Sequence, residues 1–232
     1  MRVCFLIDGF NLYHSVRAAE HRLGGGPLRW LDLPALCSTL LSSTIGPGAK
    51  LTGIHYFSAL ASHLESKKPE VVKRHRTYLA ALKAHGVSVY LAKFKKKDRK
   101  ATLDRLRIQI RPFRRSWRIP ISWVRVTMKT HEEKETDVAI AVKLFELLHR
   151  QDCEAVILMT GDTDLAPAIR MAKKLFPAST VSIAFPYARH NRELQRLAPT
   201  SVKISAALYR KHQFPSVLTT PSGRRIIKPD VW

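Results

Sequence analysis

Carboxylates stand at three points where the sequence predicts that a strand ends or a helix begins. Asp8 follows an apolar run at residues 3–7, and Asp162 and Asp164 follow another at residues 155–159. Asp137 opens a segment with helical periodicity. In a parallel α/β sheet the carboxyl ends of the strands form the ligand-binding edge, so these four acids are expected to converge there. Negative charges so near one another need compensation. A hard divalent cation such as Mg²⁺ or Mn²⁺, which prefers oxygen ligands, would supply it.

Each acid also has a simpler interpretation. Asp8 can serve only a turn at the end of a strand, because it precedes a glycine. Asp164 can serve only as the N-cap of the following helix. Asp137 can be no more than a favourable charge near a helix N-terminus. The metal hypothesis therefore depends on the combination of acids and not on any one of them.

The elements that must position these acids alternate between strands and helices. Strands are predicted at residues 3–7, 51–58, 87–93, 155–159 and 180–184, with a further β-rich segment at 121–128. Helical spacing of apolar residues predicts helices near 12–19, 33–41, 69–85, 137–150, 165–175 and 192–197. The alternation predicts a Rossmann-like α/β/α sandwich of three layers with a mostly parallel central sheet. We expect one domain over residues 1–212, with a basic insertion at about 93–120, and an extended tail over 213–232.

The balance of charge points to a polyanionic partner. The 232 residues contain 40 Lys and Arg against 18 Asp and Glu, a net charge of +22. Such an excess on a chain that is 45% apolar is typical of a folded protein that binds nucleic acid. The chain shows no membrane-length apolar run and no signal-peptide pattern, so we expect a cytoplasmic protein without a membrane partner. The three scattered cysteines are expected to be core residues.

Nearly half of this excess lies in one segment. Residues 93–118 hold twelve basic residues and two acidic ones, a net charge of +10, with three aromatic residues among them. Arginine beside aromatic residues suits single-stranded RNA, although a solvated basic loop has the same composition. The candidate RNA contacts, including two outside the segment, are Lys93, Lys95, Lys96, Lys97, Arg99, Arg114, Arg115, Arg118, Lys134 and Arg189.

The acidic motifs resemble those of a known family. The stretches are 8–12 (DGFNL), 133–139 (EKETDVA) and 160–165 (TGDTDL). In this order they are similar to the signature of the NYN domain family, within the LabA-like branch of the PIN-like ribonucleases. The resemblance runs from about residue 2 to 210, and it implies a Rossmann-like fold and metal-dependent ribonuclease activity.

The same resemblance implies roles for individual residues. Asp8, Asp137 and Asp162 would be metal ligands, and Asp164 would complete or tune the site. Asn11 would hold a carboxylate or a water by hydrogen bonding. Thr160 and Thr163 would donate hydrogen bonds to the ligands. One residue departs from the family pattern, because Glu135 stands where a small residue, commonly glycine, is expected; it can add a carboxylate or crowd the site.

The sequence thus favours an endoribonuclease in which Mg²⁺ or Mn²⁺ activates water for attack on phosphorus, leaving 5′-phosphate and 3′-hydroxyl ends. The alternative is an RNA-binding module of the same fold that cuts weakly or not at all. A phosphotransferase or phosphatase on a similar sheet is a third option, disfavoured because no DxDxT-like motif follows the first strand. The oligomeric state is left open, with a homodimer among the options.

Overall fold

The computed structural model describes the backbone of residues 1–110, 115–220 and 222–230, and the side chains of residues 1–95, 134–220 and 222–230. The chain divides into two units, residues 1–93 with 135–232 and residues 94–134. The first unit holds all four candidate aspartates.

The central sheet has the strand order β4-β3-β2-β1-β5-β6-β7. Its strands are β1 (Arg2–Asp8), β2 (Lys50–Ala59), β3 (Ser88–Ile110), β4 (Arg115–Lys134), β5 (Ala155–Met159), β6 (Thr180–Phe185) and β7 (Ser201–Lys203). From β3 across to β7, each neighbouring pair is parallel. The predicted mostly parallel sheet is therefore confirmed.

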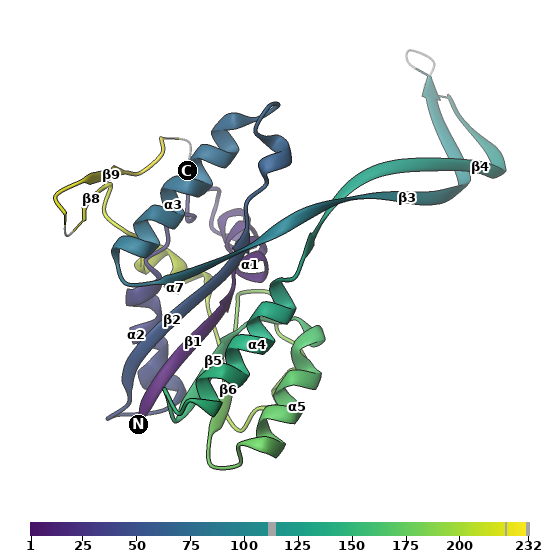
Figure 1. Cartoon of the computed structure of the whole chain (residues 1–232). Coiled ribbons are helices and arrows are strands. Elements are labelled where there is room, and N and C mark those ends of the chain that lie inside the picture. Colours follow the sequence, from purple (N-terminus) through teal and green to yellow (C-terminus); the bar gives the residue numbers. More distant parts are fainter. Residues whose placement is uncertain (111–114, 221, 231–232) are drawn as a thin grey trace. The chain divides into compact units, whose positions relative to one another are not determined.

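Helices lie on both faces of this sheet (Figure 1). They are α1 (Gly9–Arg22), α2 (Leu33–Thr44), α3 (Pro69–Ala84), α4 (Thr136–His149), α5 (Ala166–Leu175), α6 (Arg192–Leu197) and α7 (Ala206–Lys211), with short 3₁₀ helices at Ser62–Leu64 (η1) and Thr163–Leu165 (η2). Within the described residues, no helix is both apolar enough and long enough to cross a membrane.

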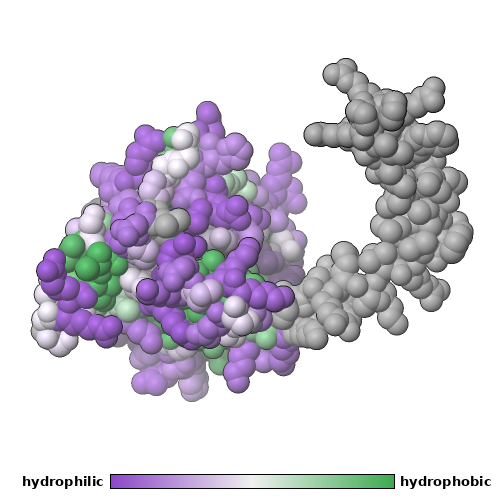
Figure 2. Space-filling view, turned by 90° about the horizontal axis from the view of Figure 1, so that it is seen from above, coloured by the Kyte–Doolittle hydropathy of each residue, from purple (hydrophilic) through white to green (hydrophobic). Residues whose placement is uncertain are grey.

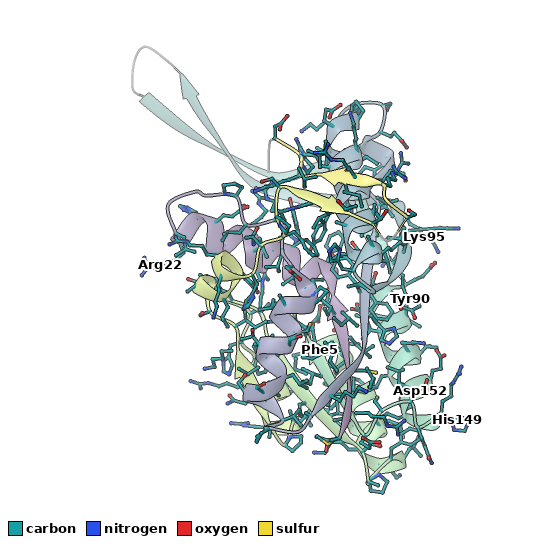
Figure 3. The ribbon with its side chains drawn as sticks, turned by 90° about the vertical axis from the view of Figure 1, so that its left-hand side faces the viewer. Phe5, Arg22, Tyr90, Lys95, His149 and Asp152 are labelled. Carbon is teal, nitrogen blue, oxygen red and sulfur yellow. The ribbon has the colours of Figure 1, made fainter. Side chains whose placement is uncertain are left out.

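The three layers follow from the alternation of side chains along the buried strands. On β1, Phe5 and Ile7 pack into the core beneath α1, α2 and α3, whereas Leu6 packs into the core beneath α4 and α5. Figure 3 shows Phe5 in the interior of the first unit, between the sheet and its helices. Strand β1 is apolar on both faces, as expected for the central strand of a parallel sheet. Its register with β5 places Ile7 opposite Met159.

The C-terminal segment adds to the first core. Strands β8 (Val217–Thr219) and β9 (Arg225–Ile227) form an antiparallel pair. Phe214, Leu218 and Ile226 are buried in the core beneath α1, α2 and α3. The three cysteines are also buried and free, as predicted.

The basic segment differs most from its prediction. The third strand does not end at residue 93, because β3 continues to Ile110. Strand β4 then begins at Arg115 and includes the β-rich segment 121–128. The second unit thus consists mainly of two long neighbouring strands, where the sequence predicted a basic insertion at about 93–120 and a β-rich segment at 121–128.

Candidate metal centre

The candidate site lies where the direction of strand order reverses. From β1 the chain adds β2 and β3 on one side of the sheet, and it later returns to add β5, β6 and β7 on the other. Ligands of open α/β sheets bind at this switch point, beyond the carboxyl ends of the strands. Asp8 ends β1 and Thr160 directly follows β5, so both lie at that point.

Asp8 is held by two hydrogen bonds at the end of β1 and the start of α1. Its Oδ1 accepts a hydrogen bond from the backbone N–H of Asn11 at 2.9 Å, which caps α1. Its Oδ2 accepts one from the hydroxyl of Thr160 at 3.0 Å. Burial raises the pKa of Asp8, the two hydrogen bonds oppose that rise, and the charge of Asp162 adds to it. Both carboxylate oxygens of Asp8 therefore already have partners.

The loop after β5 is organised by the same threonine. The Thr160 oxygen accepts a hydrogen bond from the backbone N–H of Asp162 at 3.1 Å, while its hydroxyl donates to Asp8. In turn Asp162 Oδ1 accepts from the backbone N–H of Asp164 at 3.0 Å. Asp162 is therefore the N-cap residue of η2. The interpretation of Asp164 as an N-cap is wrong, because Asp164 lies inside the first turn of η2.

Asp137 completes the cluster from the first turn of α4. One carboxylate oxygen from each of Asp137, Asp162 and Asp164 lies within 4.8 Å of the others. Burial, followed by the charges of Asp8, Asp162 and Asp164, raises the pKa of Asp137 from 3.8 to about 6. Three of the four acids form this group, whereas Asp8 is not part of it and acts on Asp137 through its charge.

Asn11 has a different partner from the one expected. Its backbone N–H, not its side chain, contacts the Asp8 carboxylate. The Asn11 side-chain oxygen accepts a hydrogen bond from the backbone N–H of Gly161 at 3.2 Å. Asn11 therefore joins the start of α1 to the loop that carries Asp162. Thr163 is half-buried at the start of η2, and its role as a hydrogen-bond donor to the ligands stays a prediction.

Two glycines of the motifs have functions that sequence reasoning missed. A Cβ on Gly161 would lie 2.0 Å from the carbonyl oxygen of Arg189, and one on Gly9 would lie 2.4 Å from that of Phe57. Neither position can hold a side chain without moving backbone. The available signal was a glycine at the first or second position after a buried strand, which often marks close backbone approach.

The departure at Glu135 has a backbone explanation. Glu135 precedes α4 with φ of 83°, in the left-handed region that glycine adopts without strain. This conformation explains why a small residue was expected there. The Glu135 side chain is exposed, and its carboxylate is not part of the group of three.

The candidate RNA contacts are only partly described. Lys93, Lys95 and Lys134 are exposed, and Arg189 is exposed beside Gly161. The side chains of the others lie outside the described residues; these are Lys96, Lys97, Arg99, Arg114, Arg115 and Arg118. Figure 2 looks onto the end of the first unit to which the strands point, and the visible surface there is mainly hydrophilic.

The donor set fits a hard divalent cation. The clustered atoms are all carboxylate oxygens, the ligands that Mg²⁺ and Mn²⁺ prefer. A cation among Asp137, Asp162 and Asp164 would relieve the repulsion that raises the pKa of Asp137. Burial is the larger cause of this raised pKa, and the charges of the neighbouring carboxylates, which a cation would offset, add to it.

Comparison with known proteins identifies the family of this chain. The model of the NYN domain family matches residues 2–205. The chain is 23% identical over its whole length to 75% of 6-hydroxy-3-succinoylpyridine 3-monooxygenase HspA from Pseudomonas putida (strain DSM 28022 / S16). A crystal structure of a protein of unknown function from Vibrio parahaemolyticus RIMD 2210633 is similar over 88% of this chain and 93% of its own, with a TM-score of 0.51 and 16% identity. The chain belongs to the NYN domain family.

Proposed function

We propose that the protein is a metal-dependent endoribonuclease that hydrolyses phosphodiester bonds of RNA. The observation that carries the proposal is the group of three carboxylates, Asp137, Asp162 and Asp164, at the switch point of the sheet. The family is related to RNA and to nucleases that use divalent metals, which agrees with this chemistry.

Asp137, Asp162 and Asp164 would hold Mg²⁺ or Mn²⁺. Such an ion lowers the pKa of water and offsets negative charge on phosphoryl oxygens when it is bound. Hydrolysis then adds the hydroxyl of water to phosphorus and a proton to the departing 3′ oxygen, giving 5′-phosphate and 3′-hydroxyl ends.

The chain's own residues fix the positions of these ligands. Thr160 ties Asp8 to the loop of Asp162 by two hydrogen bonds. Asn11 ties that loop to the start of α1. The charge of Asp8 adds to the negative potential at Asp137, which favours cation binding. With the net charge of +22 attracting a polyanion, a cation at this site would separate the acids from the phosphate backbone.

The proposal is tested by cleavage of single-stranded and structured RNA with Mn²⁺ or Mg²⁺. The native chain is expected to cut, and Asp162→Asn is expected to lose most of that activity. Asp152→Asn is the matched control, because Asp152 is a surface acid paired with Arg150. Equal cleavage by all three proteins, or cleavage that persists in EDTA, would end the assignment.

A binding module without turnover is the second candidate. It is favoured by one observation: both Asp8 oxygens are engaged by protein donors, so Asp8 is less available as a ligand than expected. This candidate predicts RNA binding with a steep dependence on salt and no cleavage under any divalent ion. Metal-dependent RNA cleavage by the native chain, absent from the Asp162→Asn variant, would exclude a binding module without turnover.

A further inference from the structure

Helix α1 carries an aromatic and basic stripe that starts beside the acidic site. Phe10, Tyr13, His14 and Arg17 follow the i, i+3, i+4, i+7 spacing of one helix face. Tyr13, His14 and Arg17 are exposed and Phe10 is half-buried, whereas the opposite face is buried in the core. Because Asp8 caps the N-terminus of this helix, the stripe leads away from the candidate metal centre.

The rings of the stripe form a connected surface. The centroid of the His14 ring lies 5.6 Å from that of Tyr13 and 6.1 Å from that of Phe10. Tyr13 keeps 44% of its surface exposed. An exposed ring of this kind offers a face on which a nucleobase can stack.

Two guanidinium groups flank these rings. Burial lowers the pKa of His14, and the charges of Arg189 and Arg17 lower it further, so both charges lie near the imidazole. The backbone of Arg189 packs against Gly161, in the loop of Asp162. Among the described residues, neither Arg17 nor Arg189 forms an ion pair, which leaves both charges available to phosphate.

We propose that this stripe binds single-stranded RNA on one side of the bond to be cut, with a base stacked on Tyr13 and phosphates at Arg17 and Arg189. The proposal rests on the proposed function, since it names the form of substrate that the same site takes. Exposed aromatic rings flanked by arginine suit unpaired bases, whose faces a duplex hides.

The test is binding of a labelled short oligouridylate to the full chain in EDTA, measured by fluorescence anisotropy over a range of salt. Tyr13→Ala is expected to weaken binding about ten-fold or more, while Tyr13→Phe stays close to the native chain. Arg17→Ala is expected to reduce the slope of log K against log salt by roughly 0.7. Lys50→Ala is the control, because Lys50 is exposed at the start of β2. It therefore lies at the amino ends of the parallel strands, away from the carboxyl ends where the site lies.

Native affinity in Tyr13→Ala and Arg17→Ala would overturn the proposal, as would equal affinity for a duplex of the same length or no binding by the native chain. Binding in EDTA does not depend on cleavage, so the two proposals can fail separately. If the stripe variants bind RNA weakly but the native chain never cuts RNA with Mn²⁺, the RNA-binding proposal is supported and the nuclease proposal is wrong. If the native chain cuts and the variants bind normally, the stripe alone is wrong.

Discussion

Replacing Asp137 with asparagine should stabilise the metal-free protein. The substitution keeps the shape of the side chain and removes one charge from a site where burial, followed by the charges of three other aspartates, raises the pKa of Asp137 to about 6. A rise from 3.8 to about 6 corresponds to at most about 3 kcal/mol of unfavourable free energy for the ionised form. Because Asp137 is only half-buried, solvent screening reduces this to about 1–2 kcal/mol.

The sign of the pH dependence follows from the same shift. The folded chain holds its proton on Asp137 up to about pH 6, whereas the unfolded chain releases it near pH 4. The contribution of Asp137 to stability is therefore lost as pH rises from about 4 through about 6, and the loss is complete above that range. Asp137→Asn should escape this loss, so its advantage grows over the same window and then levels off.

The assay is thermal unfolding in EDTA between pH 5 and pH 8. Above pH 6.5 the Asp137→Asn chain is expected to melt roughly 2 to 8 °C higher than the native chain. Asp152→Asn, the surface control, should show no such gain. Saturating Mn²⁺ should then raise the melting temperature of the native chain more than that of Asp137→Asn. A variant that is neutral or less stable in EDTA at pH 7.5 would refute the electrostatic reasoning.

Substitutions at three further positions test single features of the site. Glu135→Gly should raise the unfolding free energy in urea by about 0.5–1 kcal/mol by relieving the positive φ, and Glu135→Ala should not; a loss with glycine would contradict this. Gly161→Ala should lower the melting temperature and weaken the shift with Mn²⁺, since its Cβ meets the Arg189 carbonyl; a native melting curve would refute that contact. Thr160→Val should cost about 1–3 kcal/mol in urea unfolding while Thr160→Ser stays near native, and equal stability would mean the bridge to Asp8 is unimportant.

Much of the fold could be predicted because the buried strands are short apolar runs. The prediction for β5 has the observed bounds, Ala155–Met159, and the run at residues 3–7 lies inside β1. Strand β3 could not be predicted beyond residue 93, because its continuation is strongly charged and lacks the apolar pattern that marks a buried strand. There the pairing of neighbouring strands outweighs the local composition.

The candidate site was predicted at the level of which acids meet. Strand ends and a helix start were enough to bring Asp8, Asp137 and Asp162 to one edge of the sheet. These sequence positions could not show that the Asp8 carboxylate accepts hydrogen bonds from the Thr160 hydroxyl and from the backbone N–H of Asn11. Those contacts depend on loop geometry across distant parts of the chain. The contact of Gly161 with Arg189 has the same cause, because it joins two loops that follow different strands.

Anomalous diffraction from crystals soaked in Mn²⁺ tests the central claim most directly. The account predicts a manganese peak bound by carboxylate oxygens of Asp137 and Asp162, with Asp164 beside it, and no peak there in Asp162→Asn crystals. A strong peak elsewhere with none among these three aspartates, or an arginine side chain filling the space between them, would contradict it.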